Sequence, residues 1–158
     1  IAPDVQRPVT NSERIFYERL NAEAGTAVAQ AVEAFVGRLT DRMGIISVPG
    51  RGKTISLNLK SADNRFNFAS IQEGGQVWFF GIVNKTEEIG ARELGEGYLE
   101  ELARIVGGQV DRSTMPWSWS VRRAGRYIPV AEYLKHEQAW TELIERTLAR
   151  IAEHEEGE

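Results

Sequence analysis

The segment Ser47–Thr54 comes closest to a motif with known chemistry. Its sequence, SVPGRGKT, matches the phosphate-loop pattern G-x-x-x-x-G-K-[ST] except at the first position, where Ser47 replaces glycine. A phosphate loop opens a helix whose N-terminal dipole faces the anion, whereas the residues that follow Thr54 alternate between apolar and polar, as in a strand. We therefore expect the tip of a β-hairpin, on which Arg51 and Lys53 are candidate contacts to an anion.

Residue types needed for catalysis or metal binding are scarce. The chain has no cysteine and two histidines, His136 and His154, neither of which belongs to a metal-ligand spacing such as H-E-x-x-H. The segments expected to form strands contain no Asp or Glu, so they lack the clustered carboxylates of a metal-dependent nuclease. No serine lies in a G-x-S-x-G context. The sequence thus predicts no catalytic residue, no cofactor and no metal site, and it favours a protein that is not an enzyme.

The net charge of -4 over 158 residues conceals a polarity along the chain. Residues 38–85 carry seven basic and three acidic residues, and residues 107–127 carry four basic and one acidic. Residues 86–106 and 128–158 are acidic instead. We expect a basic sheet and a basic tryptophan-containing arm beside acidic helices, with arginine, the better bidentate anion contact, as the dominant cation.

Aromatic residues accompany these basic segments. Trp117 and Trp119 lie in the arm with three arginines, and either the Val77 face or the Trp78 face of segment 77–83 adjoins polar strand positions. Proteins that bind single-stranded nucleic acid stack bases on such aromatics, although large aromatics also fill cores and domain interfaces. The candidate contacts to an anion or a nucleic acid are Arg51, Lys53, Lys60, Arg65, Trp117, Trp119, Arg122, Arg123 and Arg126.

The elements that position these residues follow from hydrophobic periodicity and turn signals. Thr10 and Glu13 form a capping box at the start of a short helix, and a second helix is expected over Thr26–Met43 with Gly44 as its stop. Strands joined by short turns must pair antiparallel. The predicted fold class is α+β, an antiparallel four- to five-stranded meander flanked by N-terminal and C-terminal helices. Strands are expected over 45–48, 54–60, 65–71 and 77–83, a fifth strand or extended arm over 115–121, and helices over 87–106, 130–135 and 137–154.

The sequence also indicates how the chain is organised. We expect a linker-like segment over residues 1–9, a single α+β domain over 10–152 and an acidic tail over 153–158, which together suggest a fragment of a longer protein. The apolar runs are shorter than the ~18 residues of a membrane span, and no signal-peptide pattern is present. These observations favour a cytoplasmic location without a membrane partner.

The chain resembles a family of uncharacterised bacterial α+β domains. The residues that carry the resemblance are Ser12-Glu13-x-x-Phe16, a glycine-rich turn before an aromatic strand, and Arg126-Tyr127-Ile128-Pro129-Val130 before a tryptophan-containing helix. Domains of that family lie C-terminal to other modules, some of them nuclease-like. The resemblance implies a nucleic-acid context and supplies no catalytic residues.

Three functions remain open at this point. The first is a non-catalytic accessory or interaction domain of a larger bacterial protein in a DNA-processing or defence context, with another domain of the chain or a partner protein as its target. The second is a nucleic-acid-binding domain that uses the basic sheet face and the Trp/Arg arm. The third is a small-ligand or enzyme domain with a cleft near Trp117 and Trp119.

Overall fold

Two helices lead into the sheet in the computed structural model, which describes residues 10–50 and 54–157. In α1 (Asn11–Ala24), the Thr10 hydroxyl accepts a hydrogen bond of 3.1 Å from the Glu13 amide, as the capping box predicts. Helix α2 (Thr26–Met43) has the predicted bounds. Gly44 ends it in the left-handed conformation, in which its amide bonds the Thr40 carbonyl.

The four-stranded sheet is the predicted antiparallel meander. Strands β1 (Ile46–Pro49), β2 (Ser56–Lys60), β3 (Asn67–Gln72) and β4 (Val77–Trp78) lie in chain order. Asn58 pairs with Val48 on one side and Ser70 on the other, and Ser70 pairs in turn with Trp78. Residues in register share a face, so this line of pairs defines one side of the sheet.

The fourth strand is shorter than predicted. Segment 77–83 is apolar throughout, but β4 ends at Trp78, and Gly81 (φ 89°) caps a helix, α3 (Ile82–Glu88). Ile82 and Val83 are buried because α3 packs against α4 (Arg92–Val106). The long helix expected over 87–106 is therefore wrong at its start, where Gly90 (φ 77°) separates the two helices.

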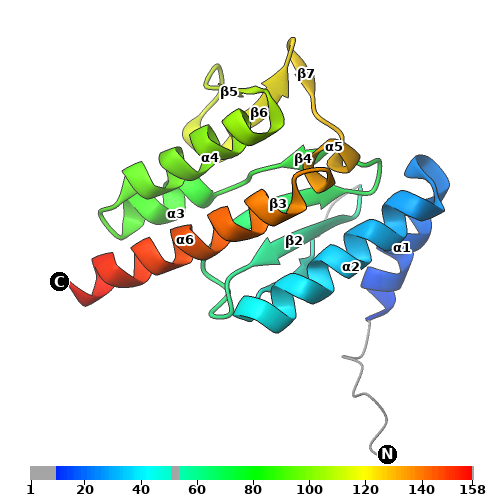
Figure 1. The fold of residues 1–158 in the computed structure, drawn as a ribbon, viewed down its shortest axis with the longest axis horizontal. Helices are drawn as coiled ribbons and strands as arrows, with labels where there is room; N and C mark the ends of the chain where they lie inside the picture. Colours follow the sequence, from blue (N-terminus) through cyan, green and yellow to red (C-terminus); the bar gives the residue numbers. More distant parts are fainter. Residues whose placement is uncertain (1–9, 51–53, 158) are drawn as a thin grey trace, which may run out of the picture.

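A second, three-stranded sheet lies where a fifth strand or an extended arm was expected over 115–121. Strands β5 (Gln109–Asp111), β6 (Ser120–Arg123) and β7 (Arg126–Tyr127) are antiparallel, and a 3₁₀ turn, η1 (Pro116–Ser118), precedes β6. This small sheet lies against α4 at one edge of the molecule, and η1 packs against α3 (Figure 1). A bridge between Gln76 and Pro129 ties the small sheet to the end of the large one.

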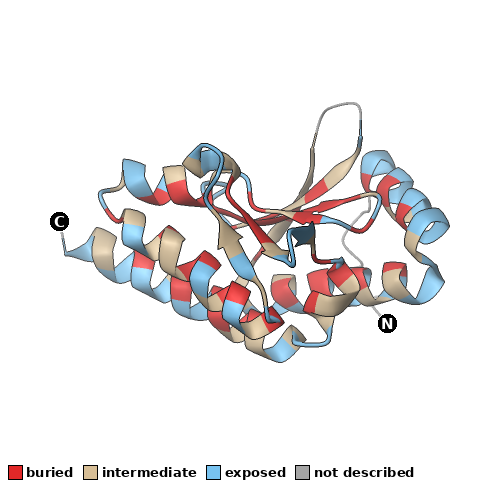
Figure 2. Ribbon diagram, turned by 90° about the horizontal axis from the view of Figure 1, so that it is seen from above, coloured by how far each residue is buried: buried red, intermediate tan, exposed pale blue. Residues whose placement is uncertain are grey.

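The C-terminal helices α5 (Val130–Leu134) and α6 (Glu137–Glu156) complete the core. Helix α6 extends through most of the residues predicted to be an acidic tail. With α2 it lies along one face of the four-stranded sheet (Figures 1 and 2). Trp140 of α6 stacks on Phe35 of α2, their ring centroids 4.8 Å apart. In the part of the chain that is described, no helix is long and apolar enough to span a membrane.

Candidate ligand-binding surface

The two faces of the four-stranded sheet differ in burial along β2, whereas β3 is buried at every position. In β2, Leu57 and Leu59 are fully buried toward the helices, whereas Ser56, Asn58 and Lys60 are only half-buried. We call the side that carries Asn58 the open face. The register places Ser70 and Trp78 on this same face, so the structure selects the Trp78 side, not the Val77 side, as the one beside the polar positions.

Polar side chains at the centre of the open face bond to one another. The Ser70 hydroxyl donates to Asn58 Oδ1 at 2.5 Å, and Asn67 Nδ2 donates to Ser70 Oγ at 2.8 Å and to the Phe80 carbonyl at 3.3 Å. Two buried polar atoms on this face, Asn67 Oδ1 and Trp78 Nε1, find no hydrogen-bond partner among the described residues. Such unpaired groups are rare in interiors built for stability alone.

Four aromatic rings line up where the two sheets meet. Ring centroids are 6.0 Å apart for Tyr127 and Trp78, 5.1 Å for Trp78 and Phe80, and 6.2 Å for Phe80 and Trp117. We call Tyr127, Trp78, Phe80 and Trp117 the aromatic row. Phe80 is 37% exposed and Trp117 49%, and neighbouring Met115 is 64% exposed. These three are apolar side chains of a kind that proteins bury in cores or interfaces.

The structure separates the two tryptophans that the sequence grouped together. Trp119 is 7% exposed, and its Nε1 donates to the Thr114 carbonyl at 3.0 Å. The guanidinium carbons of Arg92 and Arg112 lie 5.5 and 5.1 Å from its ring centroid. Trp119 is therefore part of the packing between α4 and the small sheet, while Trp117 belongs to the exposed row.

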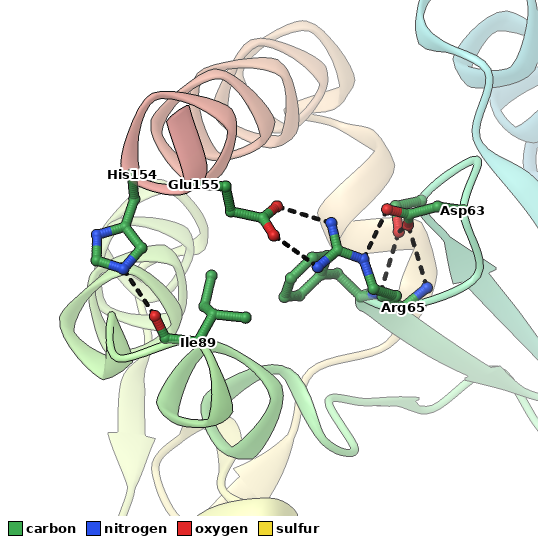
Figure 3. A network of polar contacts seen from close by, with 7 residues as sticks. Asp63, Arg65, Ile89, His154 and Glu155 are labelled. Carbon is green, nitrogen blue, oxygen red and sulfur yellow. Dashed lines mark hydrogen bonds and ion pairs between the residues drawn. The ribbon is translucent and has the colours of Figure 1, made fainter. Parts of the chain in front are cut away.

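Arg65, a predicted anion contact, forms ion pairs with two carboxylates of the chain itself. Its guanidinium bonds Asp63 and Glu155, each with a nitrogen–oxygen distance of 2.7 Å, and thereby joins the β2–β3 turn to α6 (Figure 3). Hydrogen bonds to Glu155 and then Asp63 raise the pKa of Arg65 above its ordinary value. Beside this pair, a ring nitrogen of His154 lies 2.7 Å from the Ile89 carbonyl oxygen, which ties α6 to α3.

The three arginines of the small sheet differ in their surroundings. Arg122 lies 3.2 Å from Asp111 through Nε, and Arg123 lies 4.0 Å from Glu132. Arg126 is exposed, and its side chain has no ion pair or hydrogen bond with any residue that the structure describes. Of the other predicted contacts, half-buried Lys60 lies on the open face, and Arg51 and Lys53 fall outside the described residues.

Burial and ion pairs shift the pKa values of several described groups. Burial raises the pKa values of Tyr98 and Tyr133, which lie in the core away from the open face. The hydrogen bond from Arg42 lowers the pKa of Glu145, an exposed carboxylate on α6. Within residues 10–50 and 54–157, no three His, Asp or Glu side chains gather as metal ligands would.

Sequence reasoning found Trp117 but gave no role to Tyr127 or Met115. Tyr127 follows Arg126 in the short strand β7. Its position in the sequence does not reveal that its ring contacts Trp78, which is distant in the chain. The kinship with bacterial domains expected from the sequence stays a prediction. Comparisons with protein-family models, with curated proteins and with solved structures found no match for this chain.

Proposed function

We propose that this chain is a non-catalytic interaction domain that holds an apolar segment of a protein partner against the aromatic row. The observation that carries the proposal is the exposure of Phe80 and Trp117, whose ring centroids lie 6.2 Å apart at one end of the row; exposed Met115 lies two residues before Trp117 in the chain. Aromatic residues and Met are enriched in protein interfaces, where a few large side chains supply most of the binding energy. The partner segment belongs either to a second protein or to another domain of a longer chain.

The row is held in place before any partner arrives. Trp78 is half-buried between Phe80 and Tyr127, and the Phe80 carbonyl accepts from Asn67. The Gly81 amide bonds the Trp117 carbonyl at 3.0 Å, which fixes η1 beside the end of β4. A binding surface that is already ordered loses less conformational entropy on association, so its contacts translate into affinity more fully.

Single-stranded nucleic acid is the second candidate, because partly exposed aromatic rings together with Arg126 also suit bases and phosphates. The charges weigh against it. Arg65 and Arg123 are next to carboxylates, and Arg112 forms an ion pair with Glu100. A cleft for a small ligand between Trp117 and Trp119 has less support, because Arg92 and Arg112 cover Trp119.

Selection from a displayed peptide library followed by affinity measurement tests the proposal. Peptides selected on the wild-type chain are synthesised with a fluorophore, and their Kd is measured by anisotropy for Trp117→Ala and Phe80→Ala. We expect a loss of about tenfold or more for each, as for interface hot spots. Ile15→Ala is the matched control, because Ile15 is also an exposed apolar residue but lies on α1. Equal affinities for wild type and both row variants would contradict the proposal.

A labelled oligodeoxythymidylate separates the two classes of partner. If the protein partner is correct, this strand shows no salt-sensitive association with the wild-type chain. Micromolar binding that weakens as salt rises and is lost in Arg126→Glu would favour the nucleic-acid function instead, since phosphate contacts release counterions.

A further inference from the structure

A depression of about 450 Å³ lies between the β3–β4 turn and the β6–β7 hairpin. Gly74 and Gly75 form one wall, and Arg122, Arg126 and Tyr127 form the other. These segments are distant in sequence, but the Val130 amide bonds the Gly75 carbonyl at 2.8 Å and fixes the walls to each other. The shape of the depression is thus fixed by backbone hydrogen bonding between its walls.

The wall of the depression carries two arginines and no carboxylate. Arg122 is held in one orientation: its Nη1 donates to the Gly125 carbonyl at 3.2 Å, and its guanidinium carbon lies 4.3 Å from the Tyr127 ring centroid. Asp111, 3.2 Å from Arg122 Nε, balances part of that charge from behind. Arg126 has no such partner among the described residues, so the depression keeps an uncompensated positive charge.

Tyr127 links this depression to the aromatic row. It is one wall of the depression and also the first ring of the row, 6.0 Å from Trp78. The consecutive ring spacings of 5.1 to 6.2 Å correspond to at most about five residues of extended peptide, each of which advances ~3.3 Å. Because Tyr127 belongs to both the row and the depression, a segment bound on the row is within reach of the two arginines.

We infer that this depression binds an oxyanion, a carboxylate or a phosphate, carried at one end of the partner segment that covers the aromatic row. The inference rests on the proposed function for its partner, but the pocket has its own chemistry. Guanidinium groups match the paired oxygens of carboxylates and phosphates. The glycines of the opposite wall place no side chain between the anion and the backbone.

Titration of the isotopically labelled full chain followed by NMR tests the inference. The probes are inorganic phosphate, phenyl phosphate and phenylacetate, with sodium chloride at equal ionic strength as the blank. We expect saturable shifts at the amides of Gly74, Gly75 and Gly125 and at Arg122 Nε, larger for phenyl phosphate or phenylacetate than for inorganic phosphate. The stronger of the two aromatic probes identifies the anion.

Arg126→Gln removes the uncompensated charge at an exposed position and should weaken probe binding by about tenfold, the loss typical of a charge-assisted contact. Arg104→Gln, an equal charge change at an exposed position on α4 outside the pocket wall, should leave probe binding unchanged. Shifts that do not saturate, or that are the same in Arg126→Gln and wild type, would overturn the inference.

The two proposals fail in different ways. Trp117→Ala should leave inorganic phosphate binding intact, because Trp117 is at the other end of the row. If the Arg126-dependent shifts persist while selected peptides ignore Trp117 and Phe80, the anion site stands and the interaction surface falls. If peptides need Trp117 but no probe saturates at Arg126, the anion site alone is wrong.

Discussion

Phe79 and Phe80 are consecutive residues that directly follow β4 and have opposite surroundings. Phe79 is 1% exposed, and its ring centroid lies 6.4 Å from that of Tyr98 and 6.1 Å from that of Tyr133. Phe80 is over a third exposed and contacts Trp78 and Trp117. The Phe79 ring is covered by the core, while the rings of Phe80 and Trp117 remain partly in water. Apolar area that does not serve folding is the kind that serves binding.

Buried side-chain hydrogen bonds are present on both faces. On the covered face, the Tyr98 hydroxyl donates to the Phe68 carbonyl at 2.7 Å and accepts from Trp140 Nε1 at 3.0 Å, so sheet, α4 and α6 share one bonded group. On the open face, Asn67 and Trp78 each keep an unpaired buried atom within the described chain. The core on the covered side has one such atom as well, the Tyr133 hydroxyl. We therefore expect burial of the rings, more than hydrogen bonding, to make the covered face the larger contributor to stability.

The sharpest test of this comparison is the pair of alanine substitutions at the two phenylalanines. Phe79→Ala leaves a cavity among buried rings and should lower the free energy of unfolding by about 3–5 kcal/mol. Phe80→Ala removes a partly exposed ring and should lower it by about 1 kcal/mol or less. Urea denaturation followed by circular dichroism measures both. Similar losses for the two variants would show that the open face is also part of the stabilising core.

Two buried tyrosines provide the next test. Tyr98→Phe leaves the Phe68 carbonyl and Trp140 Nε1 without their shared partner and should cost about 1–3 kcal/mol of unfolding free energy. Tyr133→Phe is the matched control, because the Tyr133 hydroxyl is buried without a hydrogen-bond partner among the described residues. Its removal should be neutral or stabilising, since it leaves no group unpaired. Equal costs in denaturation experiments would contradict the role given to the Tyr98 bonds.

Much of the fold could be predicted because local residue types mark where many of its helices and strands begin and end. Gly44 stops α2 where an α-left conformation is needed, and the alternation of β2 is visible over Ser56–Lys60. The prediction failed after β4, where an unbroken apolar run hid a change of element. The start of this run forms β4, and Ile82 and Val83 are buried as part of α3. Because both parts are apolar, hydrophobicity alone did not mark the boundary between strand and helix.

Less of the candidate site could be predicted, because it depends on pairings between distant segments. Which face of β4 is open follows from the register of Ser70 with Trp78, and the place of Trp117 follows from its ring contact with Phe80. Basic composition was a weaker guide. Arg65 is 90 residues from its partner Glu155, and no spacing in the sequence reveals that a helix brings them together.

The smallest expected effect concerns the ion pairs of Arg65 with Glu155 and Asp63, which join α6 to the β2–β3 turn. The hydrogen bond from Arg65 lowers the pKa of Glu155. Burial raises the pKa of Asp63, but hydrogen bonds from Ser61 and Arg65 outweigh it, and the net pKa is lowered. Both carboxylates thus bind protons more weakly in the folded chain than in the unfolded one, where their pKa values are about 4.

Their stabilisation is complete above that pH and is lost as the pH falls through the lower folded values. Arg65→Gln should therefore lower the Tm slightly at pH 7, by a difference that shrinks below about pH 4 and also shrinks in 1 M salt, which screens exposed charges over ~3 Å. Thermal melts of both chains across this range measure the difference. A gap in Tm that stays constant with pH and salt would mean that Arg65 acts through its packing on Phe66, whose ring centroid lies 4.8 Å from the guanidinium carbon.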